Sequence, residues 1–146
     1  MDTSYRFEFV DDIATADAAF RAYGDDLAGM FASAAAALFA TIVELDSIQQ
    51  QAGVKVEIVA DDREQLLFKW LAELVYLKDT RREVYSEFEV EVTLLEDGYR
   101  LSATIKGESF DPERHQARVD VKAVTYHQLE VKETDSGYEG FVILDL

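Results

Sequence analysis

Two aspartates near opposite ends of the chain each interrupt an apolar segment, and together they could bind a cation. Asp17 opens a segment of small apolar residues, and Asp145 lies in the apolar stretch 141–146 that runs to the last residue. A terminal segment as apolar as this one must be paired in a sheet, so we expect its aspartate to be held rigidly. If the two ends of the chain meet, the two carboxylates converge into a site for a hard cation.

This pair of carboxylates has two interpretations. Oxygen ligands suit Mg²⁺, Ca²⁺ or Mn²⁺, and Leu146 carries the terminal carboxylate as a third oxygen donor beside Asp145. Alternatively, Asp17 caps a turn and Asp145 is solvated at the end of a strand. A buried carboxylate without a partner is costly, so the first interpretation requires a cation, a basic side chain or N–H donors nearby.

Lys122 is the third candidate, because we expect it to lie within a strand. A lysine in a strand is usually a solvated charge that discourages edge-to-edge aggregation. If its side chain points toward either aspartate, it becomes a counter-charge or a group that contacts phosphate. We expect most of the remaining acidic residues to cap helices, lie in turns or face solvent. Asp12 and Glu108 are the two for which we expect a further role.

Several kinds of chemistry are excluded or disfavoured by composition. The chain contains no cysteine and only two histidines, His115 and His127, which argues against a zinc site and a thiol nucleophile. No glycine-rich phosphate loop or nucleophile–base motif is present, so we predict no catalytic residue and no enzymatic activity. The net charge of −16 disfavours direct binding to nucleic acid. With no signal-peptide pattern and no apolar run long enough to span a membrane, we expect a cytoplasmic protein.

Periodicity of apolar residues predicts the elements of the first half. We expect Asp25 to cap the first helix, Asp61 to open the second through a capping box with Glu64, and Trp70 to be a core residue. The expected elements are strands at 5–10 and 18–23, an amphipathic helix at 26–45, a strand at 54–59 and a helix after 61–64.

From residue 84 the apolar period changes to two, which indicates strands. We expect a hairpin with its turn at 96–98, a loop at 107–116, and strands near 117–132 and 138–145 with a turn at 134–137. The result is a single α+β domain spanning residues 1–146, with two helices packed on a largely antiparallel sheet.

Several sequence blocks, in this order, are similar to the archease family, and the similarity runs from about residue 5 to the terminus. The blocks are Ile13–Asp17, Phe20–Gly24, Leu27-x-x-Met30-Phe31, Ala34–Phe39, Leu66–Leu77, Gly107-Glu108, Val121–His127 and Phe141–Leu146.

The resemblance implies a fold with an inserted strand–helix–strand–strand module and a function that composition does not show. Archeases are accessory proteins of the GTP-dependent RNA ligase that joins tRNA exons; they promote ligase guanylylation and multiple turnover. The resemblance places the family's metal-binding aspartates at Asp17 and Asp145, and its functional strand lysine, which would serve nucleotide or cofactor binding, at Lys122. The implied cofactor is a divalent cation, and the implied partner is the ligase.

One position departs from the family pattern. Many archeases carry histidine immediately before the Thr-Ala-Asp tripeptide, whereas Ala14 stands there in this chain, which puts a histidine contribution at that corner in doubt. Two other functions compete with the ligase activator: a small metal-dependent hydrolase that uses the two aspartates, and a chaperone-like binding module for RNA-modifying enzymes. A bound cation distinguishes the binding module from the others, and dependence on added ligase distinguishes the activator from the hydrolase.

Overall fold

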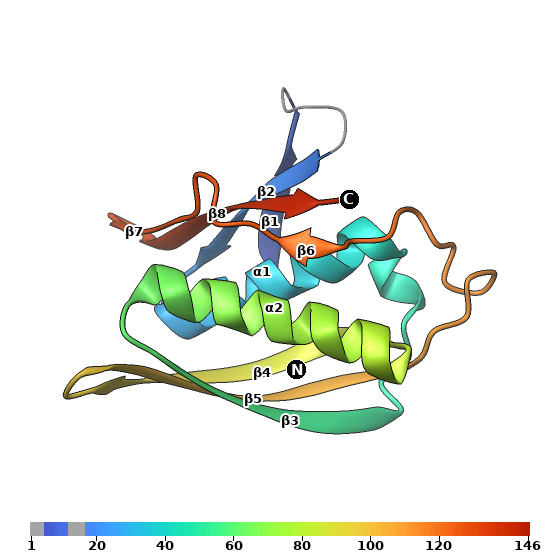
Figure 1. The fold of residues 1–146 in the computed structure, drawn as a ribbon, viewed down its shortest axis with the longest axis horizontal. Coiled ribbons are helices and arrows are strands. Elements are labelled where there is room, and N and C mark those ends of the chain that lie inside the picture. Colours follow the sequence, from blue (N-terminus) through green and yellow to red (C-terminus); the bar gives the residue numbers. More distant parts are fainter. Residues whose placement is uncertain (1–4, 12–16) are drawn as a thin grey trace.

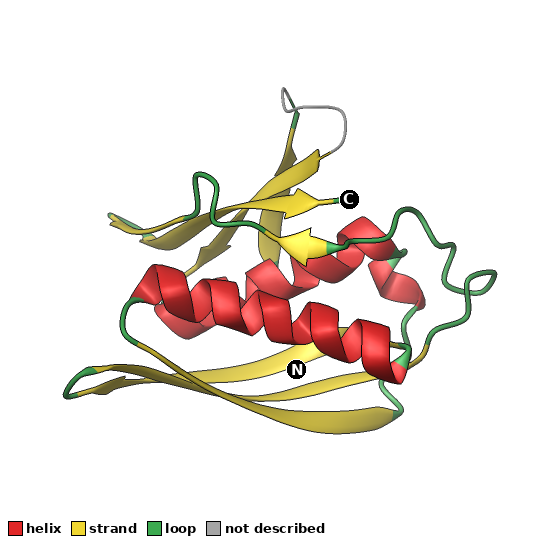
Figure 2. Ribbon diagram, in the orientation of Figure 1, coloured by secondary structure: helices red, strands yellow, loops and turns green. Residues whose placement is uncertain are grey.

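Two antiparallel sheets enclose two helices, as Figure 1 and Figure 2 show. The computed structural model describes residues 5–11 and 17–146. The helices are α1 (Leu27–Ile42) and α2 (Arg63–Arg81), and a 3₁₀ turn, η1 (Leu45–Ser47), follows α1. The predicted α+β class is confirmed, and the helices pack between two sheets, where the sequence predicted one.

The first sheet has five strands and contains both ends of the described chain. Its order is β1 (Arg6–Val10), β2 (Asp17–Gly24), β8 (Gly137–Asp145) and β6 (Ala123–Val124). The fifth strand, β7 (Glu130–Thr134), pairs with the first half of β8, whereas β6 pairs with its end. The predicted strands at 5–10, 18–23 and 138–145 are therefore confirmed. The central strand β8 is flanked by β2 on one side and by β6 and β7 on the other.

The second sheet has three strands, in the order β3 (Ala52–Ala60), β5 (Gly98–Ser109) and β4 (Glu83–Leu95). Together with α2, these strands form the expected strand–helix–strand–strand module, and the hairpin turn lies at Glu96-Asp97 as predicted. The predicted loop at 107–116 starts later, because β5 continues to Ser109.

Helix α1 is buried on all sides from Met30 to Ile42, whereas the sequence predicted an amphipathic helix. The reason is its position between both sheets, against which an all-apolar, alanine-rich surface can pack closely. Helix α2 keeps the predicted apolar face, and Trp70 within it is fully buried and donates its indole N–H to the carbonyl of Phe31 at 2.9 Å.

The predicted helix boundaries are wrong by a few residues. Asp26, not Asp25, caps α1 by accepting from the N–H of Gly29, and α1 ends at Ile42 rather than at residue 45. The capping box of α2 is also shifted by one residue. Asp62 accepts from the N–H of Gln65, and the Gln65 side chain accepts from the N–H of Asp61.

The predicted strand at 117–132 is wrong over most of its length. Only Ala123–Val124 and Glu130–Thr134 pair with β8, and the rest follows an irregular path. Hydrogen bonds from side chains and turns fix this segment, instead of the backbone pairing of a strand. For example, Arg118 donates to the carbonyl of Ala40 at 2.8 Å.

No helix in the described ranges is long and apolar enough to cross a membrane.

Candidate functional site

Asp17 and Asp145 are direct cross-strand partners in the five-stranded sheet. Strand β2 begins at Asp17 and β8 ends at Asp145. Figure 1 shows the end of β8 next to the label C. Side chains directly opposite each other in antiparallel strands share a face, with their Cβ atoms about 4.5–5.5 Å apart. The predicted convergence of the two ends of the chain therefore occurs.

Lys122 lies beside this pair, although just before β6 rather than within a strand as predicted. Its backbone N–H donates to the carbonyl of Asp145 at 2.9 Å, and the next residue, Ala123, is the cross-strand partner of Asp145. The side chain of Lys122 is exposed. Three segments remote in sequence thus bring the two carboxylates and the backbone of Lys122 to one corner of the sheet.

Two carboxylates directly opposite each other on one face repel, which makes a cation at this position favourable. No basic side chain forms an ion pair with Asp17 or Asp145 within residues 5–11 and 17–146. In the same ranges no group of three or more His, Cys, Asp and Glu side chains is arranged so that it could hold a metal ion by itself. The groups that this corner offers to a cation are oxygen atoms, those of the Asp17 and Asp145 carboxylates. Leu146, the third predicted ligand, directly follows the end of β8. Such a sparse oxygen set fits a hard cation that keeps several waters, such as Mg²⁺.

A second cluster of charged side chains is buried around Glu108, which the sequence singled out among the acids. Its carboxylate accepts hydrogen bonds from Arg114 at 2.5 Å, from the Gln49 N–H at 2.7 Å and from the His115 Nε2 at 2.9 Å. The His115 Nδ1 accepts from the N–H of Asp111, which leaves the proton on Nε2. This histidine is fully buried and holds the 110–118 loop against the body of the protein.

Opposing effects act on the ionisation of Glu108. Burial alone would raise the pKa of its carboxyl, but hydrogen bonds from Arg114, Gln49 and His115 outweigh it and lower the pKa from 4.5 to about 2. Glu108 is therefore charged at neutral pH and serves as the anionic centre of a structural cluster. The other histidine, His127, is exposed, and among the described residues its ring hydrogen-bonds only to the side chain of Gln128.

Lys78 on α2 is a positioning residue that the sequence analysis missed. Its side chain is 8% exposed. The ammonium group donates to Asp120 at 2.6 Å and to the carbonyl of Val121 at 2.9 Å, and it also pairs with Asp79 at 2.7 Å. These contacts fix the two residues that directly precede Lys122. The sequence does indicate that this lysine is buried, because Lys78 follows Leu74 by four residues and so lies on the apolar face of the helix.

We expect Lys78→Met to loosen this segment while keeping the side-chain volume. The variant loses a hydrogen bond to a buried carbonyl, so the free energy of unfolding should fall by about 1–3 kcal/mol. Amide exchange at Lys122 should accelerate because the segment is no longer tied to α2. The matched control is Lys69→Met, which removes an exposed lysine of the same helix that also donates to a carbonyl, that of Val59. Unchanged exchange at Lys122 in the Lys78 variant would show that β6 pairing alone fixes this segment.

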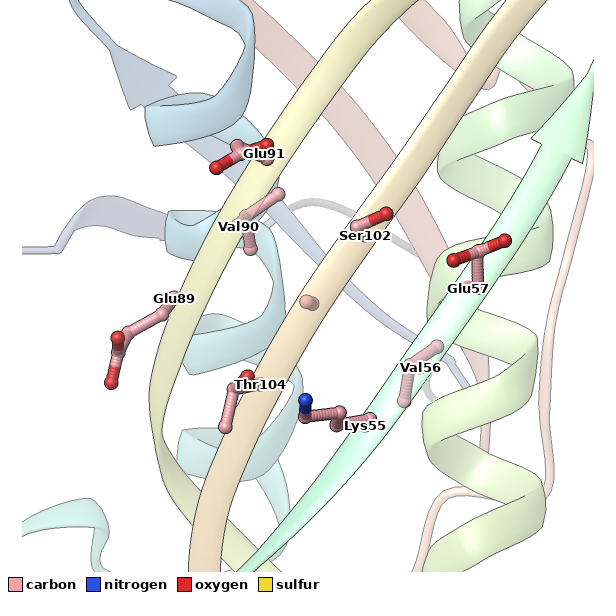
Figure 3. A pocket seen from close by; sticks show the side chains of 9 residues that line it. Lys55, Val56, Glu57, Glu89, Val90, Glu91, Ser102 and Thr104 are labelled. Carbon is pink, nitrogen blue, oxygen red and sulfur yellow. The ribbon is translucent and has the colours of Figure 1, made fainter.

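A polar hollow of about 530 Å³ lies on the outer face of the three-stranded sheet, shown in Figure 3. Glu57, Glu89 and Glu91 line it together with Ser102 and Thr104. None of the residues singled out by the sequence for metal or cofactor binding contributes to it. We interpret this face as a solvated sheet surface, and the corner with Asp17 and Asp145 remains the candidate site.

Comparison with known proteins identifies the family. Residues 7–146 match the family described as "Archease protein family (MTH1598/TM1083)". This chain belongs to the archease family. It is 41% identical to protein archease of Methanothermobacter thermautotrophicus, over 96% of this chain and 98% of that protein. It is 38% identical to protein archease of Archaeoglobus fulgidus, over 97% and 99% of the two chains.

An archease-like fold is also shown by comparison with a solved structure. The solution structure of Methanobacterium thermoautotrophicum protein 1598 superimposes with a TM-score of 0.83 at 40% identity, covering 96% of this chain and 98% of that one. The resemblance found in the sequence is thus confirmed at the level of family and fold. Asp12, one of the acids singled out in the sequence, and Ala14, where the sequence departs from the family pattern, lie outside the described residues of this chain.

Proposed function

We propose that this chain is a metal-binding accessory factor that activates a GTP-dependent RNA ligase by promoting formation of the ligase–guanylate intermediate and multiple turnover. Membership of the archease family supports an accessory role in tRNA processing. The finer assignment depends on one observation, the direct pairing of Asp17 with Asp145 beside Lys122.

In this proposal, each residue of the corner has a distinct role. Asp17 and Asp145 hold a divalent cation, whose chemistry when bound is to neutralise and orient phosphate oxygens. The terminal carboxylate of Leu146 adds a further oxygen. Lys122 supplies a positive charge beside the carboxylates, where it balances their repulsion or contacts a phosphate group of the nucleotide. Because the protein ligands are few, groups of the ligase can complete the site when the two proteins meet.

The charge of the chain agrees with a role beside the ligase. A protein with 30 acidic and 14 basic residues gains no counterion release by binding a phosphate backbone. RNA is then bound by the ligase, and the accessory protein contacts the ligase and its cation. Asp145 and Lys122 are exposed and Asp17 is half-buried, so these residues are accessible for such a contact.

The proposal is tested by measuring guanylylation of the ligase from the same organism, with GTP and a limiting divalent metal, with and without this chain. We expect a faster rate and repeated turnover when the chain is present, and no effect on nucleotide when the ligase is omitted. Nucleotide hydrolysis without ligase would instead support the metal-dependent hydrolase. Guanylylation that is unchanged by the chain at any metal concentration would contradict the proposed function.

A further inference from the structure

Strand β3 is an edge of the three-stranded sheet that no other described strand covers. It pairs only with β5 within the described part of the chain. The opposite edge, β4, is partly covered, because the N–H of Phe88 donates to the hydroxyl of Tyr5 at 2.8 Å. An uncovered edge presents a row of backbone N–H and C=O groups that another strand can pair with.

The outward backbone groups of β3 can be identified from one contact. Lys69 of α2 donates to the carbonyl of Val59 at 3.0 Å, so the backbone of Val59 faces away from β5. Because backbone direction alternates along a strand, Glu57 and Lys55 also face outward. Among the described residues nothing bonds to the outward groups of Glu57 and Lys55, so at least this part of the edge is free to pair.

A groove runs between this edge and α2. It has a volume of about 510 Å³ and is lined on the helix by Phe68, Ala72 and Tyr76, which are spaced four residues apart and share one face. Figure 3 shows α2 lying alongside β3 at the margin of the sheet. A strand added to β3 would direct alternate side chains toward this helix face.

Exposed apolar side chains gather at the same groove. Val59 is 51% exposed and Tyr76 is 60% exposed, and Tyr126, at 58%, stacks on Phe68 with ring centroids 3.9 Å apart. These make up three of the six large hydrophobic side chains that are exposed in the described ranges. Scattered exposed hydrophobic residues are normal, whereas a cluster of them marks an interaction surface.

The charge of the groove indicates what kind of added strand it can bind. Glu57 and Glu73 line the groove, and the ammonium group of Lys69 is already bonded to the carbonyl of Val59. A second copy of this chain is disfavoured by the repulsion between two molecules that each carry a net charge of −16. The surface therefore fits a segment with apolar residues at alternate positions and lysine or arginine between them.

We propose that the β3 edge and the facing side of α2 bind an extended basic segment of a partner protein by strand addition. This surface belongs to the three-stranded sheet and does not include Asp17, Asp145 or Lys122. It requires no metal and no nucleotide. Main-chain hydrogen bonds would supply much of the affinity, and contacts with Tyr76 and Phe68 would supply the selectivity for apolar residues.

The test uses a synthetic seven-residue peptide that alternates lysine with valine or leucine, titrated into the full chain without ligase or metal. We expect the peptide to slow amide exchange at Lys55 and Glu57 and to shift the signals of Tyr76. Tyr76→Ala should weaken binding at least about tenfold, because a central aromatic residue typically dominates such an interface. The control variant is Leu94→Ala, which removes a 73% exposed apolar side chain from β4 instead.

A second peptide separates strand addition from simple attraction between opposite charges. It has the same sequence, with N-methyl groups on alternate residues that remove the N–H donors but keep every charge. Equal binding of the two peptides, or equal loss of binding in the Leu94 variant, would overturn the proposal. So would no binding at peptide concentrations up to about 1 mM. Dimerisation of the chain through β3, detected by sedimentation, would show that a second copy is the occupant, contrary to the proposal.

Discussion

Replacing Asp145 by asparagine should return the rate of ligase guanylylation to that of the ligase alone. The substitution preserves shape and hydrogen bonding but removes one of the two charges that face each other across β2 and β8. Loss of a carboxylate ligand should weaken cation binding at least about tenfold, since changes even to groups behind the ligands have effects of that size. The same loss is expected for Asp17→Asn, and the rate of guanylylation at limiting metal measures both.

Stability measurements separate loss of the site from loss of the fold. Without divalent cations, Asp145→Asn should be slightly more stable than the wild type, by about 0.2–1 kcal/mol, because like charges opposite each other in a sheet are destabilising. With Mg²⁺, Ca²⁺ or Mn²⁺ present, only the wild type should gain stability, by an amount that grows with the ratio of cation concentration to its dissociation constant. Urea unfolding with and without chelator provides both comparisons.

The control is Glu130→Gln, which neutralises an exposed carboxylate on β7, four positions along the sheet from the aspartate pair. It should leave both the cation response and the activation unchanged. Full activation by the Asp145 and Asp17 variants would show that the metal site is wrongly assigned. A cation response in a wild-type chain that does not activate the ligase would retain the site but contradict the proposed partner.

The residues of this site could be predicted from the sequence. The register in which β2 pairs with β8 could not. The apolar stretch that contains Asp145 must be paired in a sheet, but nothing in the local sequence indicates that its partner is the segment beginning at Asp17. Pairing across more than 120 residues is decided by tertiary packing, and a slip of one residue would place the two carboxylates on opposite faces. The family resemblance supplied the expected pair, and the register confirms that the two residues meet.

The segment before Lys122 shows why other predictions were wrong. Alternating apolar residues near 117–132 suggest a strand, yet the chain there is held by contacts from remote side chains, among them Lys78 and Arg118. Periodicity detects a face that is buried, but it does not detect a backbone that is anchored by lysine and arginine. Likewise, the cap of α1 differs from the prediction by one position, because Asp25 and Asp26 are chemically equivalent candidates.

Replacing Glu108 by alanine is expected to lower the free energy of unfolding by about 3 kcal/mol, because the N–H of Gln49 and the buried His115 lose their common acceptor. Gly107, the preceding residue, lies so close to β4 that a Cβ would overlap the carbonyl of Val84. The backbone therefore has little room to move in response. The control is Glu113→Ala, which replaces an exposed acid in the adjoining 110–118 loop and should change stability by less than about 0.5 kcal/mol.

The stability that Glu108 contributes should depend on pH in a defined direction. Its pKa in the folded protein, about 2, lies below the ordinary value of 4.5, so its contribution is complete above about pH 4.5 and is lost as the pH falls toward 2. In Glu108→Gln, which keeps the volume and can still accept hydrogen bonds, this part of the acid dependence should disappear. Urea unfolding of the wild type, Glu108→Gln and Glu113→Ala between pH 2 and pH 7 tests this difference. A wild-type curve parallel to that of Glu108→Gln over this range would show that the carboxylate is not the anionic centre of the cluster. The 110–118 loop, and the segment it leads to before Lys122, would then be held mainly by Arg118 and Lys78.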